Sequence, residues 1–194
     1  MDQPAFIVQA WKTIARALAE AGVAADLDLK PATLLKCTRR QCMARLRQLA
    51  IMIRRLIFLM ALSIEPTPLL PRPKGNYFET EKAPTVRCLS FRITPNVSGV
   101  FPGSVRAYSG HHPGPVPAAP VIAKWSVLLL ALKHCERRAV RLARTLHRWR
   151  AEGVAKPYVL PMRHTDRLPR EPGLLAGALT LQLNLALTGW PDTG

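Results

Sequence analysis

The chain has 194 residues, which is enough for one ordinary domain or for a smaller domain that carries long irregular segments. Its 48% hydrophobic residues exclude a wholly disordered chain, and four cysteines without any C-x-x-C pair exclude a disulfide scaffold. The formal net charge of +16 is far from that of an ordinary soluble domain, and an anionic partner is the simplest way to neutralise it.

Residues 1–64 predict a helical hairpin. The first helix covers residues 3 to 22, where apolar residues alternate at spacings of four and three, namely Ile7, Trp11, Ile14 and Leu18. Pro31 suits the first turn of a second helix, which then continues without interruption to Pro66. Its apolar seam consists of Cys42, Leu46, Leu49, Ile53, Leu56 and Met60. The short connection predicts that the two helices pack antiparallel.

Residues 65–119 have a different composition, because 11 of the 18 prolines lie in the stretch from Glu65 to Pro120, with Pro120 included. Such a segment predicts either a linker or a long surface loop. Within it, residues 85 to 94 (TVRCLSFRIT) alternate apolar and polar side chains as a strand does, although a single strand is marginally stable alone.

Residues 120–153 predict a third helix that packs on the hairpin, framed by Pro120 at its start and Gly153 at its end, and about 50 Å long if it is unbroken. Its apolar side collects Trp125, Leu128, Leu132, Cys135, Ala139, Leu142, Leu146 and Trp149. Residues 154–194 form a tail with one short apolar element, LTLQLNLALT, which alternates like a strand but has the composition of a helix. Both forms stay open for that element. The predicted fold class is mainly α, a small helical bundle with a Pro-rich, largely irregular middle segment.

The third helix carries a stripe of like charge. At 100 degrees per residue, four arginines fall within about 60 degrees of one another and span about 16 Å, with Arg138 and His134 beside them. These four, called the arginine stripe below, are Arg137, Arg141, Arg144 and Arg148. Duplex DNA presents a charge about every 1.7 Å along its axis, so the stripe can meet several phosphates at once.

The second helix repeats this arrangement more loosely, on the side away from its apolar seam. Its basic residues on that side are Lys36, Arg40, Arg47 and Arg54. A solvated helix face usually mixes charges of both signs, yet residues 31 to 64 contain seven basic residues and no acid. The eight residues are therefore candidate polyanion-binding residues, and a merely solvated basic face is the alternative.

The sequence favours a non-catalytic protein that binds DNA or RNA through phosphates, with little sequence specificity. Two alternatives stay open: a peripheral membrane protein that binds anionic lipid through amphipathic helices, and a scaffold that binds an acidic protein partner. A spanning helix is not expected, because Arg54 and Arg55 interrupt the apolar stretch of residues 49 to 64.

No enzyme, cofactor or metal site is expected. His134 and Cys135 are adjacent, so on a helix they diverge by about 100 degrees and cannot easily share an ion. His164 lies near Asp166 in sequence, but no placed nucleophile accompanies them. The N-terminus opens with an acid and lacks the basic-then-apolar order of a secretory signal, which predicts a cytoplasmic protein.

Overall fold

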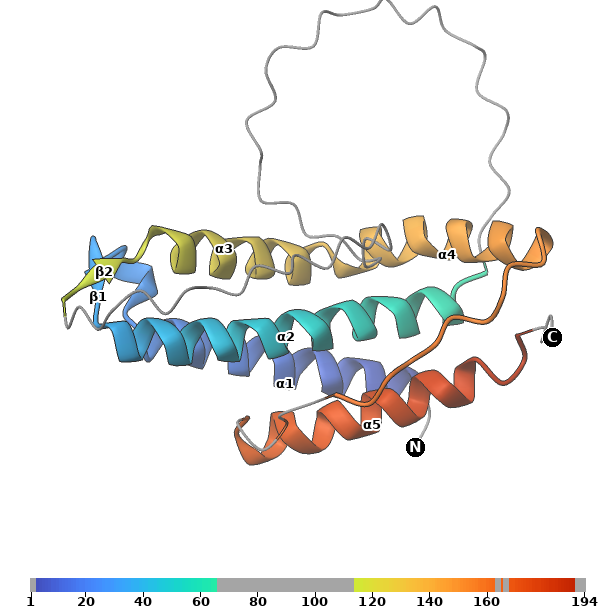
Figure 1. Ribbon diagram of the computed structural model, residues 1–194. Helices are drawn as coiled ribbons and strands as arrows, with labels where there is room; N and C mark the ends of the chain where they lie inside the picture. The colour runs from blue at the N-terminus through green and yellow to red at the C-terminus, as the bar shows by residue number, and fades with distance from the viewer. Residues whose placement is uncertain (1–2, 66–113, 163–164, 166–167, 191–194) are drawn as a thin grey trace, which may run out of the picture.

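The computed structural model describes residues 3–65, 114–162, 165 and 168–190. Within these residues the protein is mainly α, as the sequence predicts, and it forms a helical bundle (Figure 1). The helices are α1 (Gln3–Val23), α2 (Lys36–Ser63), α3 (Ala119–Lys133), α4 (Cys135–Ala151) and α5 (Arg170–Ala186). The short elements are a 3-10 helix, η1 (Leu27–Leu29), and two strands, β1 (Thr33–Leu34) and β2 (Val116–Pro117).

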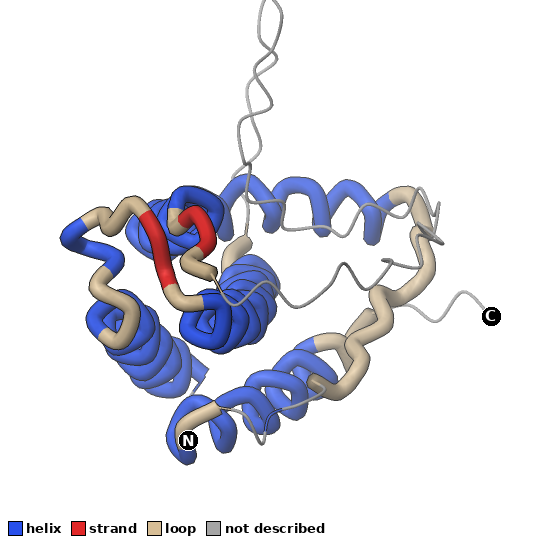
Figure 2. The backbone as a smooth tube through the Cα atoms, turned by 60° about the vertical axis from the view of Figure 1, so that its left-hand side comes forward, coloured by secondary structure: helices blue, strands red, loops and turns tan. Residues whose placement is uncertain are grey.

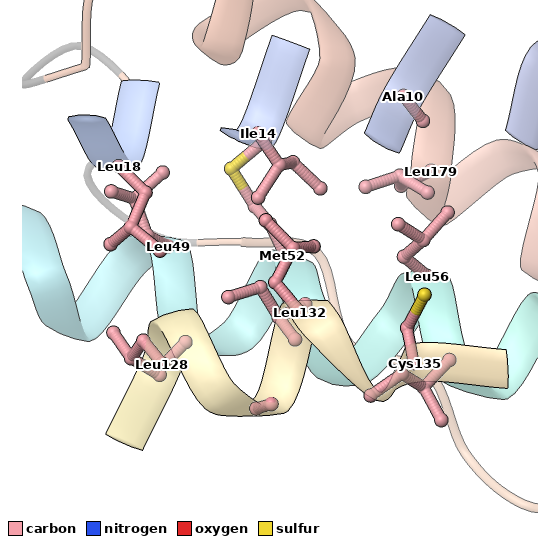
Figure 3. Packing of buried hydrophobic residues seen from close by; sticks show 14 of the residues in the cluster. Ala10, Ile14, Leu18, Leu49, Met52, Leu56, Leu128, Leu132, Cys135 and Leu179 are labelled. Carbon is pink, nitrogen blue, oxygen red and sulfur yellow. The ribbon is translucent and has the colours of Figure 1, made fainter. Parts of the chain in front are cut away.

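Helix α2 is the centre of the bundle, because it contacts each of the other four α-helices. Figure 3 shows Leu49, Met52 and Leu56 of α2 between side chains of α1 and α5 on one side and of α3 and α4 on the other. All three are fully buried. The seam read from the sequence is confirmed from Cys42 to Leu56, and Met60 at its end is half-buried. Burial of this seam stabilises the bundle, since each fully buried leucine contributes roughly 1.5–3 kcal/mol.

Helices α1 and α2 pack antiparallel, as predicted. The Cys42 thiol donates to the carbonyl oxygen of Ala21 at 3.8 Å, and Arg45 Nη2 donates to Glu20 Oε2 at 3.1 Å. Both contacts join the end of α1 to the beginning of α2. Burial raises the pKa of the Cys42 thiol, although the nearby Arg45 charge opposes this shift.

The prediction that Pro31 begins the second helix is wrong. Helix α2 begins at Lys36, because Thr33 and Leu34 are extended and pair with Pro117 and Val116 of β2 (Figure 2, strands in red). The amide of Ala118 also donates to the carbonyl oxygen of Ala32 at 3.1 Å. These backbone hydrogen bonds hold the α1–α2 connection against the segment that enters α3, and a helical first turn at Pro31 would not provide them.

The expected third helix is not one unbroken rod. It divides at His134, whose φ of −110° and ψ of 27° are not helical, into α3 and α4. Hydrogen bonds of the helical i to i−4 type still enter and leave this residue, from His134 N to Leu130 O at 3.2 Å and from Arg138 N to His134 O at 3.1 Å. The two helices accordingly run end to end along the bundle (Figure 1).

The end of α4 near Gly153 is confirmed. Gly153 has a φ of 66°, which a residue with a side chain rarely adopts, and the amide of Val154 donates to the carbonyl oxygen of Trp149 at 2.9 Å. This is the hydrogen bond of a Schellman cap. The carbonyl oxygen of Val154 then accepts from Trp190 Nε1 at 2.9 Å, which holds the end of the α5 segment against the end of α4.

The apolar element of the C-terminal tail is a helix. Leu179, Leu183 and Leu187 are buried, whereas Leu181 and Leu185 are exposed, so the leucines alternate between two faces of α5. Arg55 of α2 donates to Thr180 Oγ1 and to the carbonyl oxygen of Leu160, which fastens α5 and the segment before it to the central helix. The possible strand at residues 85 to 94 lies outside the described residues, as does most of the Pro-rich segment.

Candidate nucleic-acid interface

The arginine stripe lies on the solvent-facing side of α4. All four arginines are exposed, and the break at His134 precedes the first of them, so a single regular helix presents the whole stripe. The opposite side of the same helix is buried in the core through Cys135, Ala139, Leu142, Ala143 and Leu146. The core residues of α4 and its charged residues therefore do not compete for the same face, and the stripe can be contacted without unfolding the bundle.

Carboxylates of the described residues do not neutralise the stripe. The two ion pairs formed within this part of the chain are Arg16 with Glu171, and Arg45 with Glu20, and neither includes a stripe arginine. Helix α4 contains six arginines and one glutamate, Glu136. Neighbouring like charges along the stripe destabilise α4 by roughly 1 kcal/mol in total, which a bound polyanion would offset.

Of the four basic residues predicted on the second helix, Lys36, Arg40 and Arg47 are exposed. Arg54 differs, because it is half-buried and desolvation lowers the pKa of its guanidinium below the ordinary value. Lys36 and Arg40 lie in the first two turns of α2, at the end of the bundle next to β1 and β2, whereas α4 lies at the opposite end (Figure 1). The structure thus supports two cationic regions rather than one.

The second cationic region includes a residue that sequence reasoning missed, Lys124 of α3. Desolvation lowers the pKa of the Lys124 ammonium, and the positive charges of Arg47 and Arg54 lower it further. These three residues, called the α2–α3 cluster below, bring like charges together where α3 packs against α2. No local sequence pattern identifies Lys124, because its proximity to Arg47 and Arg54 depends on how the two helices pair.

Replacing Lys124 by glutamine is expected to stabilise the protein by roughly a few tenths of a kcal/mol at low salt. The variant keeps an aliphatic stem while it removes one of three mutually repelling charges, and added salt should reduce the gain by screening. Since the folded-state pKa is lowered, the wild-type protein should also gain stability as the pH rises toward 10.5, the ordinary value for lysine, and the variant should lack this gain.

Urea denaturation of wild type and Lys124→Gln at low and high salt measures both effects. The matched control is Lys12→Gln, which removes an exposed lysine of α1. Equal salt responses of the two variants would contradict the repulsion assigned to Lys124.

Positive charge is concentrated on one part of the bundle. Helix α2 carries seven basic residues and no acid, and α3 carries two lysines and no acid. By contrast, α1 carries two basic residues and one glutamate, and α5 carries one arginine and one glutamate. The α2–α3–α4 part of the protein is therefore strongly cationic, whereas α1 and α5 are close to neutral.

Comparison with known proteins adds no function. No protein-family model, no curated protein and no solved structure matches this chain. Among residues 3–65, 114–162, 165 and 168–190, no three His, Cys, Asp or Glu side chains are placed to share a metal ion. In the same part of the chain, every helix is too short or too polar to cross a membrane.

Proposed function

We propose that this protein binds DNA or RNA without catalysis, and that the arginine stripe of α4 contacts phosphates with little sequence preference. The observation that carries the proposal is the stripe itself, four exposed arginines on one face of a regular helix, without a carboxylate partner among the described residues. Arginine pairs well with phosphate because its planar guanidinium can donate two parallel hydrogen bonds. Phosphate contacts position a protein on a nucleic acid but do not read its sequence.

The packing of α4 supports nucleic acid over an anionic membrane. An interfacial helix places its apolar face in the lipid, next to a basic face. The apolar face of α4 instead forms part of the core, so lipid could reach it only if the bundle opened. A nucleic acid would use the charged face alone and leave the core intact.

Fluorescence anisotropy with labelled duplex DNA, single-stranded DNA and RNA of unrelated sequences tests the proposal, with protein purified under nuclease treatment. Binding to several sequences with similar affinity, and weaker binding at higher salt, would support it. Cosedimentation with anionic liposomes but not neutral ones, together with no binding to any nucleic acid, would replace it with the membrane function. Binding to an acidic protein alone would replace it with the scaffold function.

A further inference from the structure

Helix α5 is apolar on two opposite faces, and the bundle covers only one of them. Its inner face is buried through Pro172, Ala176, Leu179 and Leu183. Its outer face presents a row of apolar residues at spacings of four, three and four, which are Leu174, Ala178, Leu181 and Leu185. The three leucines, called the α5 ridge below, are 69%, 59% and 55% exposed. Such a contiguous exposed apolar row marks an interaction surface more often than a single exposed leucine does.

A groove runs beside the α5 ridge. It has a volume of about 370 Å³, and its lining includes Gly173, Gly177, Thr180 and Asn184 of α5, with Pro161 and Met162 of the preceding segment forming the other wall. Leu181 belongs to both the ridge and the groove lining. Arg55 fixes the wall through its hydrogen bond to the carbonyl oxygen of Leu160. Gly177 is open, because a Cβ built there would meet no atom within 4 Å.

The charge distribution identifies which occupant this surface suits. Two copies of a chain with a net charge of +16 repel each other, so they can approach only where the surface carries little charge. From Pro172 to Trp190 the chain has no charged residue at all, and Arg170 and Glu171 before it carry opposite charges. The outer face of α5 is thus an uncharged surface on which two copies can meet. Arg55, the charged side chain that contacts the groove lining at Thr180, is half-buried and hydrogen-bonded within its own copy.

We propose that a second copy of this chain docks on the outer face of α5. In a two-fold symmetric dimer each copy presents the same patch. The α5 ridge of each copy then packs into the groove of the other copy, which Gly173 and Gly177 line. The apolar spacing of the ridge is the spacing with which helices pack at a shallow angle. A lipid surface fits this face less well, because interfacial helices flank their apolar row with Lys or Arg, and α5 has none after Arg170.

The test measures the mass of the full chain in solution by sedimentation equilibrium, after nuclease treatment and in buffer of high ionic strength. Under these conditions nucleic acid cannot bridge two copies, so the result does not depend on the proposed function. The expected result for wild type is a saturable species of twice the chain mass. Monomer at every concentration, or association that continues past two copies, would overturn the proposal.

Three variants locate the interface. Leu181→Glu places a charge on the ridge, and Gly177→Leu fills the groove, so both are expected to abolish the dimer. Neither should impair folding, because Leu181 is exposed and Gly177 has open space around it. The matched control is Leu130→Glu, which makes the same substitution at a leucine of α3 that is 52% exposed. This variant should leave the dimer intact.

Circular dichroism and thermal melting of each variant exclude unfolding as the cause of lost association. A dimer that survives both α5 variants, or that Leu130→Glu also abolishes, would overturn the assignment. Cosedimentation of a monomeric wild-type protein with neutral liposomes, lost in Leu181→Glu, would assign the surface to lipid and overturn it as well.

Discussion

Leu56→Ala is expected to destabilise the protein by about 2–5 kcal/mol. Leu56 is fully buried on the central helix, in the cluster that also contains Leu179 of α5 and Cys135 of α4 (Figure 3). Truncation removes its transfer free energy and leaves a cavity, which side chains held on several different helices cannot easily fill. A loss of this size is a large part of the total stability of an ordinary domain, which is about 5–15 kcal/mol.

Urea denaturation followed by circular dichroism measures the free energy of unfolding of this variant. Leu130→Ala is the control, because the leucine is half-exposed on α3 and its truncation should cost less than about 0.5 kcal/mol. If the two variants lost equal stability, α2 would not be the centre of the bundle.

Gly22→Ala should destabilise the protein by about 1–3 kcal/mol, which is the opposite of the usual effect of this change within a helix. A Cβ at Gly22 would lie 2.6 Å from Cζ2 and 2.8 Å from Cε2 of Trp125, and an indole ring cannot bend away. The same ring donates from Nε1 to the carbonyl oxygen of Leu18 at 3.0 Å. Displacing it to relieve the contact would also weaken this hydrogen bond.

Two comparisons test this explanation of Gly22. Gly177→Ala, measured in the Leu181→Glu background where the proposed dimer is absent, is the matched control, because its Cβ meets no atom of the chain and the variant should gain about 0.5–1 kcal/mol from helix propensity. In a Trp125→Leu background, Gly22→Ala should become nearly neutral, since the two sites are in direct contact and their effects are not additive. Gly22→Ala behaving like Gly177→Ala in the wild-type background would contradict the packing of α1 on α3.

Local periodicity predicted the elements whose apolar residues all lie on one face. The α2 seam and the buried side of α4 follow the helical period closely, and Gly153 ends α4 with the positive φ that favours glycine. The sequence also identified the arginine stripe, because a regular helix fixes which side chains share a face. The exposure of the stripe to solvent could be predicted as well, because the opposite side of α4 is apolar enough to be buried in the core.

Features that depend on tertiary pairing could not be predicted in the same way. The start of α2 at Lys36 reflects the pairing of Thr33 and Leu34 with β2, a segment distant in sequence. The strict alternation of leucines in α5 fits a strand as well as a helix with two apolar faces, and the packing of Leu179 and Leu183 against the bundle decides between them. The α2–α3 cluster likewise exists only because α3 lies beside Arg47 and Arg54.

The salt dependence of nucleic-acid binding by a stripe variant is the most direct test of the proposed function. The stripe variant replaces all four stripe arginines, Arg137, Arg141, Arg144 and Arg148, by glutamine. Its matched control also introduces four glutamines, at exposed basic residues outside the stripe, namely Lys12, Lys30, Lys156 and Arg170. Both lower the net charge by the same amount. The stripe variant should keep its helicity and gain up to about 1 kcal/mol of stability, because like-charge repulsion along α4 disappears.

In that measurement, the plot of log affinity against log salt concentration for duplex DNA is expected to flatten by about 3.6 in the stripe variant, since about 0.9 is lost for each phosphate contact removed. The control variant should retain the wild-type slope. An unchanged slope in the stripe variant, or equal flattening in both variants, would contradict phosphate binding by α4.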